Sequence, residues 1–208
     1  MNKSKVVTGA GEVRLIAGRF RGRKLSFPAA PGLRPTGDRL RETLFSWLQT
    51  VLPGARCLDL FAGSGALGFE AASRGAREVV LVEANPAVAS ALQGNIDKLA
   101  AKELKLVRGD ALAYLERENQ PFDVIFLDPP FHGDWLTKVL HRIAERQLVV
   151  PGGWIYIENE REAGAPALPA GWSWYREKEA GQVRYALART DERDTERATD
   201  SQTEPDTP

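Results

Sequence analysis

Short apolar runs alternate with longer amphipathic segments from residue 54 onward, and this alternation constrains the fold more than any other feature. Runs such as EVVLVE and FDVIFLD are almost continuously apolar, which is typical of strands buried on both faces of a sheet. The segments between them are long enough for helical crossovers, so the strands can run parallel. We therefore expect an α/β fold with a doubly covered, mostly parallel sheet, whose strands lie within 55–61, 78–83, 104–110, 122–128 and 153–160.

The two ends of this region depart from the alternation. Residues 173–190 contain two strand-like runs joined at EAGQ, which predicts an antiparallel hairpin at the edge of the sheet. Residues 13–27 contain two short strand-like runs around Gly18 and Gly22, and we expect a second hairpin there. Residues 37–52 then place an apolar face at helical spacing, which predicts a helix packed on the core through Leu40, Leu44, Trp47, Leu48 and Val51.

The formal net charge is zero, but the charges are segregated along the chain. Residues 1–41 hold ten Lys and Arg residues against two acids, whereas residues 191–208 hold seven acids against two arginines. This pattern indicates a basic arm for a polyanion and an acidic tail without large apolar residues to bury. We expect a flexible N-terminus (1–11), a basic hairpin and helix extension (12–52), a main α/β domain (53–190) and a disordered tail (191–208).

The composition also bears on the cellular compartment. Cys57 is the one cysteine and lies in an apolar run, so it is expected in the core and cannot form an intrachain disulfide. The first residues lack the apolar stretch of a secretory signal, and no apolar run is long enough to span a membrane. A cytoplasmic location without membrane contact is the resulting expectation.

A glycine-rich turn follows the first buried strand. The sequence GSGALG satisfies G-x-G-x-x-G through Gly63, Gly65 and Gly68, and Glu83 ends the next strand 20 residues later. This context predicts recognition of an adenosine, and both NAD and S-adenosylmethionine (SAM) fit it. Asp59 favours SAM, because a carboxylate on an apolar strand needs a cation such as the methionine ammonium, whereas it would repel a pyrophosphate.

The stretch DLFAGSG resembles the first motif of the class I SAM-dependent methyltransferases. That resemblance implies a Rossmann-like sheet. It also implies that Asp59, Phe61, Gly63 and Gly65 hold the amino-acid end of SAM, that Glu83 holds its ribose, and that Asp110 with Ala111 meets the adenine. An aspartate before a helix is equally well explained as an N-cap, so the assignment of Asp110 stays open.

The run VIFLDPPF ends a buried strand in a carboxylate followed by two prolines and an aromatic ring. Since proline fixes φ and lacks an N–H, the Asp128 carboxylate and the Pro129 carbonyl form a rigid site that only accepts hydrogen bonds. An exocyclic NH2 group fits such a site, and a flat base can stack on Phe131. This matches the [DN]-P-P-[FYW] motif of amino-methyltransferases, and the predicted catalytic residues are Asp128, Pro129, Pro130 and Phe131.

No metal is needed for such a transfer, and the released proton can pass to solvent or to His132. A proline turn with an aspartate cap is the structural alternative for this loop. His141, on the next helix, is expected to be a surface or packing residue.

Basic residues concentrate in the N-terminal hairpin. GRFRGRK has spacing that mostly lines one strand face, and phosphates are the expected partners. A solvated edge strand kept soluble by its charges is the alternative reading. The candidate RNA-binding residues are Arg14, Arg19, Arg21, Arg23, Lys24 and Arg34.

Several motifs in order resemble the bacterial RsmD family: VRLIAGRFRGRKL, GLRPTGDRLRETLFSWL, CLDLFAGSGALGFEA, DPPF and WYREKEAGQVRYAL. The resemblance implies SAM-dependent methylation of guanine N2 in 16S ribosomal RNA, at guanine 966, by a monomer acting on rRNA or the small subunit. It also implies that residues 34–52 help to close the cofactor site. Alternatively, Arg34, Arg39 and Arg41 are exposed charges at a helix start.

Other functions are compatible with parts of the sequence. The catalytic loop permits a DNA adenine-N6 methyltransferase, although 208 residues leave no separate target-recognition domain. A protein-glutamine methyltransferase would normally carry Asn at position 128. A non-catalytic RNA-binding assembly factor would not need the chemical positions that this sequence fills.

Overall fold

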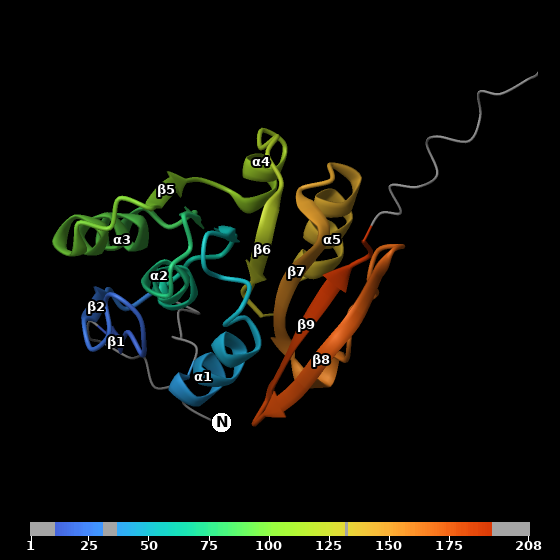
Figure 1. Cartoon of the computed structure of the whole chain (residues 1–208), viewed down its shortest axis with the longest axis horizontal. Helices are drawn as coiled ribbons and strands as arrows, with labels where there is room; N and C mark the ends of the chain where they lie inside the picture. The colour runs from blue at the N-terminus through green and yellow to red at the C-terminus, as the bar shows by residue number, and fades with distance from the viewer. Residues whose placement is uncertain (1–10, 31–36, 132, 193–208) are drawn as a thin grey trace, which may run out of the picture.

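The computed structural model describes residues 11–30, 37–131 and 133–192, and its larger sheet has seven strands (Figure 1). These strands are β3 (Arg56–Asp59), β4 (Glu78–Glu83), β5 (Leu104–Arg108), β6 (Phe122–Leu127), β7 (Val149–Glu160), β8 (Trp172–Ala180) and β9 (Val183–Thr190). Their order is β5-β4-β3-β6-β7-β9-β8; pairs up to β7 are parallel, whereas β7–β9 and β8–β9 are antiparallel. The predicted α/β fold with an antiparallel hairpin at its C-terminal edge is confirmed.

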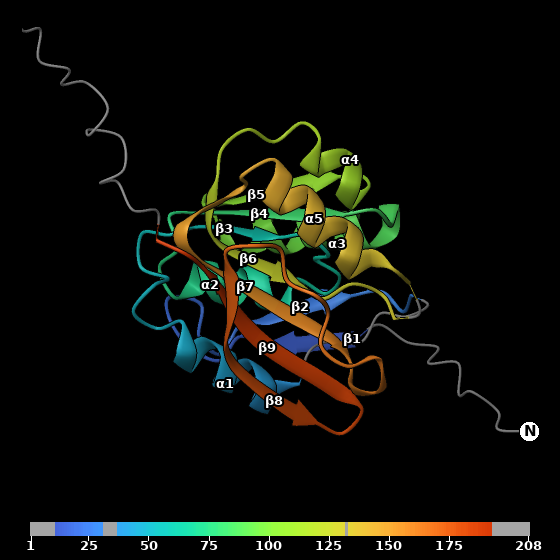
Figure 2. The same cartoon turned by 90° about the vertical axis from the view of Figure 1, so that its right-hand side faces the viewer.

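Helices cover both faces of the sheet, and those after β3 connect its parallel strands (Figure 2). They are α1 (Asp38–Trp47), α2 (Ala66–Ser73), α3 (Pro86–Leu99), α4 (Ala111–Leu115) and α5 (Trp135–Glu145), with a 3-10 turn η1 (Arg161–Ala163) after β7. One core cluster lies between the sheet and α1, α2 and α3, and a second lies between the sheet and α4 and α5. Cys57 is buried in the first cluster, as expected.

Helix boundaries follow from local chemistry. Helix α3 begins at Pro86, and the Asn85 side chain accepts hydrogen bonds from the N–H groups of Ala87 and Val88 at 2.9 and 3.2 Å. Helix α5 ends at Glu145 rather than continuing to Val149, because Gln147 adopts a positive φ of 54° and β7 starts two residues later. Helix α4 is also shorter than the segment ALAYLEREN suggested, since it ends at Leu115.

The N-terminal hairpin is present, but its arginines are not on a strand. Strands β1 (Gly11–Arg14) and β2 (Lys24–Phe27) pair antiparallel, and residues 15–23 form the turn between them. Gly18 and Gly22 have φ values of 77° and 80°, and the turn closes through Gly22 N donating to Leu15 O at 2.8 Å. The expectation that Arg19, Arg21 and Arg23 line a strand face is therefore wrong, because these residues lie in a folded loop.

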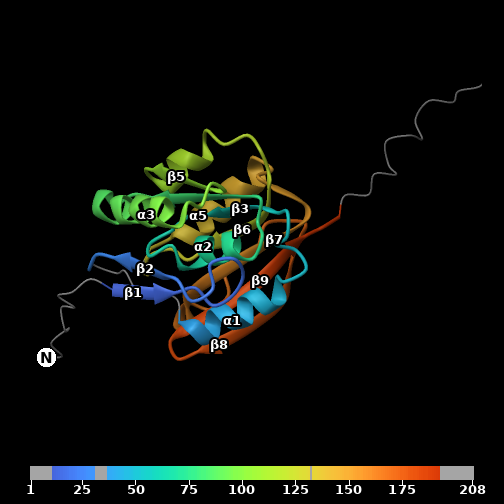
Figure 3. The ribbon, with the colours of Figure 1, turned by 60° about the vertical axis from the view of Figure 1, so that its left-hand side comes forward.

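This loop packs on the C-terminal half of α2 (Figure 3). The Glu70 carboxylate accepts hydrogen bonds from Ile16 N at 2.8 Å and Ala17 N at 3.0 Å. Ser73 Oγ accepts from Phe20 N at 2.9 Å, and Ser73 O accepts from Arg19 N at 2.7 Å. Backbone groups that have no strand partner are thus satisfied by the helix, which fixes the hairpin to the main body.

Helix α1 places its apolar face on the core as predicted, with Leu44 and Leu48 fully buried. Arg41 is also fully buried: it donates to Arg14 O at 2.9 Å and to Asp38 Oδ1 at 2.7 Å, and lies 3.5 Å from Glu70 Oε2. The alternative reading of Arg41 as an exposed helix-start charge is wrong, whereas Arg39 is exposed. No helix in the described part of the chain is long and apolar enough to cross a membrane.

Candidate active site at the carboxyl edge of the sheet

The predicted site residues follow four adjacent parallel strands. In the order β5-β4-β3-β6, Asp110 follows β5, Glu83 ends β4, Asp59 ends β3 and Asp128 follows β6. Because parallel strands end at the same edge of a sheet, one edge collects all four carboxyl groups. Two segments far apart in sequence, the glycine turn and the Asp-Pro-Pro-Phe loop, follow the neighbouring strands β3 and β6.

The glycine turn between β3 and α2 requires residues without side chains. Gly63 and Gly65 have φ values of 50° and 79°, in the left-handed region, and Gly65 is the N-cap of α2. A Cβ on Gly68 would lie 2.2 Å from Leu81 Cδ2, so this glycine allows α2 to approach β4. The glycines therefore let the chain turn at the carboxyl edge while α2 stays close to the sheet.

Asp59 is buried, with 2% of its surface exposed, and its Oδ2 accepts a hydrogen bond from Gly68 N at 2.9 Å. Burial raises the pKa of Asp59 to about 7; the Gly68 hydrogen bond opposes this rise, and the charge of Glu83 adds to it. A cation placed near this carboxyl group would favour its ionised form. The geometry also gives Asp59 a structural role, because it anchors the first turn of α2 to β3.

Glu83 connects the two loops beside it. Its Oε2 accepts from Gly63 N at 2.9 Å and its Oε1 accepts from Asn85 N at 2.7 Å. Asp110 is close by along the edge, since Gly109 N donates to Glu83 O at 3.0 Å. The Asp110 side chain is the N-cap of α4 and accepts from Ala113 N at 3.0 Å, which confirms its capping role, while Ala111 behind it is buried. A contact of Asp110 with adenine stays a prediction.

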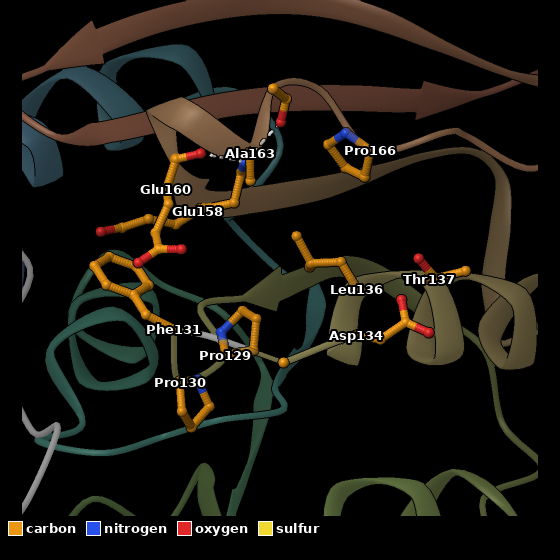
Figure 4. A pocket seen from close by; sticks show the side chains of 13 residues that line it. Pro129, Pro130, Phe131, Asp134, Leu136, Thr137, Glu158, Glu160, Ala163 and Pro166 are labelled. Atoms are coloured by element: carbon orange, nitrogen blue, oxygen red, sulfur yellow. Dashed lines mark hydrogen bonds between the residues drawn. The ribbon is translucent and has the colours of Figure 1, made fainter.

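The Asp-Pro-Pro-Phe loop borders a pocket of about 280 Å³ (Figure 4). Asp128 is half-buried, Pro129 is buried, and Phe131 has 39% of its surface exposed. The opposite wall comes from the end of β7 and the segment after it. The pocket is lined by Pro129, Pro130, Phe131, Gly133, Asp134, Leu136, Thr137, Glu158, Asn159, Glu160, Ala163, Gly164 and Pro166.

Comparison with known proteins identifies the family. The model of a family described as conserved hypothetical protein 95 matches residues 13–189. Ribosomal RNA small subunit methyltransferase D of Escherichia coli K12 is 46% identical over 180 residues, which cover 86% of this chain and 91% of that protein. The protein of the same name from Haemophilus influenzae is 42% identical over 192 residues, covering 90% of this chain and 98% of that protein. The chain belongs to this family.

Solved structures agree with the membership in the RsmD family. The E. coli protein yhhF superposes with a TM-score of 0.83 at 42% identity, covering 88% of this chain and 100% of that one. The Thermus thermophilus 16S rRNA N2 G1207 methyltransferase RsmC, solved with AdoMet and guanosine, superposes with a TM-score of 0.62 at 25% identity. That match covers 88% of this chain and 50% of RsmC.

SAM is the cofactor of this RsmD-family chain, and the carboxyl edge fits it. Three acidic residues, Asp59, Glu83 and Asp110, stand at the ends of the adjacent strands β3, β4 and β5, and Gly63 and Gly65 shape the turn that follows β3. Such a set can accept hydrogen bonds from ribose hydroxyls and from an ammonium group. Phe61 is half-buried beside this turn and packs edge-on against Trp135, with ring centroids 5.8 Å apart.

The basic residues lie elsewhere. Arg14, Arg19, Arg21, Arg23 and Lys24 are all exposed, but the turn that carries three of them packs at the end of α2 opposite the glycine turn. Arg19 forms an ion pair with Glu103, and Lys24 forms one with Glu12 at 2.8 Å. Arg21 and Arg23 form no ion pair within the described residues.

Two predicted positions, Arg34 and His132, lie outside the described residues. His141 is on the surface, as expected: 79% of its side chain is exposed. Residues 1–10 and 193–208, which include most of the two predicted flexible ends, are likewise outside the described residues.

The sequence analysis did not assign Glu158, which lines the same pocket as the catalytic loop. Glu158 is 6% exposed, and Tyr156 Oη donates a hydrogen bond to its Oε2 at 2.7 Å. Burial raises the pKa of Glu158, and the hydrogen bond from Tyr156 opposes that rise. The pattern WIYIENE alternates Tyr156 and Glu158 onto one strand face, and this signal could have identified the residue.

Proposed function

We propose that this chain methylates the exocyclic N2 of a guanine in 16S ribosomal RNA, at guanine 966 by family resemblance, with SAM as methyl donor. The observation that carries the proposal is the pocket bordered by the Asp-Pro-Pro-Phe loop, in a chain whose relatives are named rRNA small subunit methyltransferases. This loop follows β6, the strand next to the one that leads into the glycine turn. The fold shared with RsmC, which was solved with AdoMet and guanosine, supports a guanine in this place.

The protein contributes mainly by positioning. Bound SAM supplies an activated methyl group. Asp128 and the Pro129 carbonyl accept the two N2 hydrogens, which turns the nitrogen lone pair away from the ring. Phe131 offers a partly exposed ring on which the flipped base stacks. Holding nitrogen and methyl in line provides the acceleration, and the proton leaves to solvent.

The remaining assignments follow the same proposal. Asp59, Phe61, Gly63 and Gly65 hold the amino-acid end of SAM, Glu83 holds the ribose, and Asp110 with Ala111 borders the adenine. Residues 12–52 form the extension that contacts RNA and closes the cofactor site, and residues 53–190 form the catalytic domain. The chain acts in the cytoplasm as a monomer on rRNA or on the small ribosomal subunit.

Substitution of the catalytic carboxylate tests the proposal. We expect wild-type protein to transfer a labelled methyl group from SAM to small subunits or 16S rRNA and to yield N2-methylguanosine. Asp128→Ala should lower the rate about 100-fold or more, because the amine is no longer oriented, while SAM binding persists. Asp97→Ala, which removes an exposed carboxylate on α3, should leave transfer unchanged.

The outcome also separates the alternatives. If the wild-type protein methylated adenine N6 in DNA and transferred no methyl group to rRNA, the proposed function would be wrong and the DNA adenine-N6 methyltransferase alternative would be correct. Undiminished transfer to guanine by Asp128→Ala would show that the loop does not hold the amine.

A further inference from the structure

Two acidic residues occupy corresponding positions on neighbouring strands: Asp128 directly follows β6, and Glu158 is near the end of β7. Leu127 pairs with Ile157 in the parallel register, and both side chains belong to the core under α4 and α5. Since side chains alternate along a strand, the next residues, Asp128 and Glu158, both point to the opposite face. Adjacent strands are about 4.8 Å apart. Burial raises the pKa of Tyr156, and the charges of Glu158 and Asp128 add to that rise, so both carboxyl groups lie near this hydroxyl.

The environment of Glu158 suits a ligand contact. Within the described residues, Tyr156 Oη is the only group that donates a hydrogen bond to Glu158, and it uses Oε2. Glu158 lines the pocket with Pro129 and Phe131, although its surface is 94% buried in the protein. Figure 4 shows the carboxyl groups of Glu158 and Glu160 turned toward the side of the pocket where Phe131 lies.

A buried carboxylate is costly unless it receives hydrogen bonds from donors. Tyr156 provides one donor to Glu158, and Oε1 is open to a second. Burial raises the pKa of Glu158, so a bound group that donates a hydrogen bond would favour the ionised form. A ligand rich in N–H donors therefore fits this wall of the pocket better than one that presents acceptors.

Among the amino-bearing bases, guanine presents the most suitable edge. Its N1–H and its N2 amine are adjacent donors, so guanine can satisfy two neighbouring carboxylates at once. Adenine presents its N6 amine beside N1, and cytosine presents its N4 amine beside N3; both ring nitrogens are acceptors. In those bases a lone pair would face the second carboxylate, which is unfavourable.

We propose that Glu158 is a specificity-determining residue that accepts the N1–H of the target guanine, while Asp128 and the Pro129 carbonyl hold its N2 amine. Tyr156 is a positioning residue that orients Glu158 through its hydroxyl group. This inference rests on the proposed function and extends it, because the Asp-Pro-Pro-Phe loop by itself recognises an amine and not a particular base.

A base analogue lacking the N1–H tests the assignment. The substrate is a small subunit reconstituted with 16S rRNA that carries guanosine or 2-aminopurine riboside at the position methylated by wild-type protein. 2-Aminopurine keeps the amine but presents an acceptor at N1. We expect wild-type protein to prefer guanine about 10- to 100-fold in kcat/KM, because the analogue places a lone pair against Glu158.

Glu158→Gln should reverse most of this preference. The amide keeps the shape of the side chain and can donate a hydrogen bond to N1 of 2-aminopurine. The variant should therefore have a lower kcat/KM on guanine and a higher kcat/KM on the analogue, so that the preference falls at least tenfold. Tyr156→Phe should relax the preference in the same direction. This second variant keeps the inference testable if Glu158→Gln does not fold, as judged by thermal unfolding and SAM binding.

Glu162→Gln provides the matched control. It makes the same chemical change on an exposed side chain of η1 and should keep the wild-type preference. An unchanged preference in both folded variants, or a shift caused by Glu160→Gln instead, would overturn the role of Glu158. If wild-type protein transfers no methyl group to guanine N2, the proposed function itself is wrong. That outcome is distinguishable from a wrong role for Glu158, in which the wild-type protein methylates guanine and the variants keep its preference.

Discussion

Gly68 lies where α2 packs closely against the sheet, and a side chain of any size at this position would collide with Leu81 of β4. A Cβ at this position would lie 2.2 Å from Leu81 Cδ2 and 3.1 Å from Asp59 Oδ2. The same residue donates its N–H to Asp59 at 2.9 Å. One glycine thus sets both the helix position and the hydrogen bonding of the buried carboxyl group.

Gly68→Ala should therefore destabilise the protein by about 1–3 kcal/mol, because the core must shift to admit a methyl group. Urea unfolding measures this change. Gly94→Ala on α3 is the matched control: a Cβ there meets nothing within 4 Å, so the gain in helix propensity should stabilise by about 0.5–1 kcal/mol. Equal effects of the two substitutions would contradict the packing argument.

Asp59 makes SAM binding dependent on pH if it contacts the methionine ammonium. The folded pKa of Asp59 is about 7, raised first by burial, so the free protein holds this group largely protonated at pH 5.5. A bound cation favours the ionised form, so affinity rises as the pH rises toward 7. The α-amino group of SAM titrates near pH 7.7–8.0, which sets the upper limit of a clean measurement.

Calorimetry of SAM binding from pH 5.5 to 7 should show the dissociation constant falling by up to about tenfold. Asp59→Asn should bind SAM more weakly at pH 7 and with a flat pH dependence, since the amide does not titrate. A wild-type affinity that does not change over this range would remove Asp59 from the ammonium contact and leave its structural role in anchoring α2.

At the scale of elements, Glu70 joins three parts of the chain that are distant in sequence. Its fully buried carboxylate accepts backbone hydrogen bonds from the arginine-bearing turn, pairs with Arg74 on its own helix at 2.7 Å, and faces Arg41 of α1. The hairpin, α1 and α2 are thereby held in one arrangement. The position of the extension relative to the glycine turn depends on this buried group.

Glu70→Ala should destabilise the protein by about 3 kcal/mol, because it leaves the buried Arg41 cation and two backbone N–H groups without this acceptor. Chemical denaturation gives the loss, and hydrogen exchange should show Ile16 and Ala17 losing protection first. Glu42→Ala, which removes an exposed acid from α1, should change stability by less than about 0.5 kcal/mol. If Glu70→Ala also changed the free energy of unfolding by less than about 0.5 kcal/mol, the extension would be held by apolar packing alone.

The elements differ in how well the sequence alone predicts them. The buried strands were predictable, because almost continuously apolar runs such as EVVLVE and FDVIFLD are typical of strands covered on both faces of a parallel sheet. The arginine turn was not, since GRFRGRK imitates strand alternation, and its turn depends on positive φ at Gly18 and Gly22 and on Ser73 of a distant helix. The burial of Arg41 likewise requires Glu70, 29 positions later in the sequence.

The sequence likewise predicts only part of the candidate active site. The positions of Asp59, Glu83 and Asp128 at one edge of the sheet were predictable, because each carboxyl group stands at the carboxyl end of an apolar strand. Glu158 occupies an equivalent place at the end of β7, but a single motif does not show that β7 lies beside β6. Strand order, which is set by tertiary packing, is what brings Glu158 to Asp128.

At the scale of the whole molecule, the candidate site and the exposed arginine turn lie at opposite ends of α2. The helix starts at the glycine turn, and Gly75 just beyond its end is bonded to Gly54 at the amino edge, at 2.8 Å. Eight residues of helix span about 12 Å. An RNA that contacts both places must therefore span at least about this distance along the molecule.

If the turn contacts phosphates, its arginines set the salt dependence of RNA binding rather than the chemistry. Each lost phosphate contact lowers the slope of log K against log salt by about 0.7–0.9, so Arg21→Ala/Arg23→Ala should lower it by about 1.5. The rate of methyl transfer in the bound complex should stay unchanged, because the turn is far from the Asp-Pro-Pro-Phe loop. Filter binding over a salt series, with single-turnover transfer in parallel, measures both quantities.

Arg117→Ala/Lys138→Ala removes two exposed cations from the opposite, α4–α5 side of the sheet, and should keep the wild-type slope. The comparison separates a located contact from a general loss of positive charge, since both double variants change the net charge equally. Equal slopes for the two variants would place the RNA elsewhere, whereas a selective effect of the turn would show that recognition extends the full length of α2 from the reacting base.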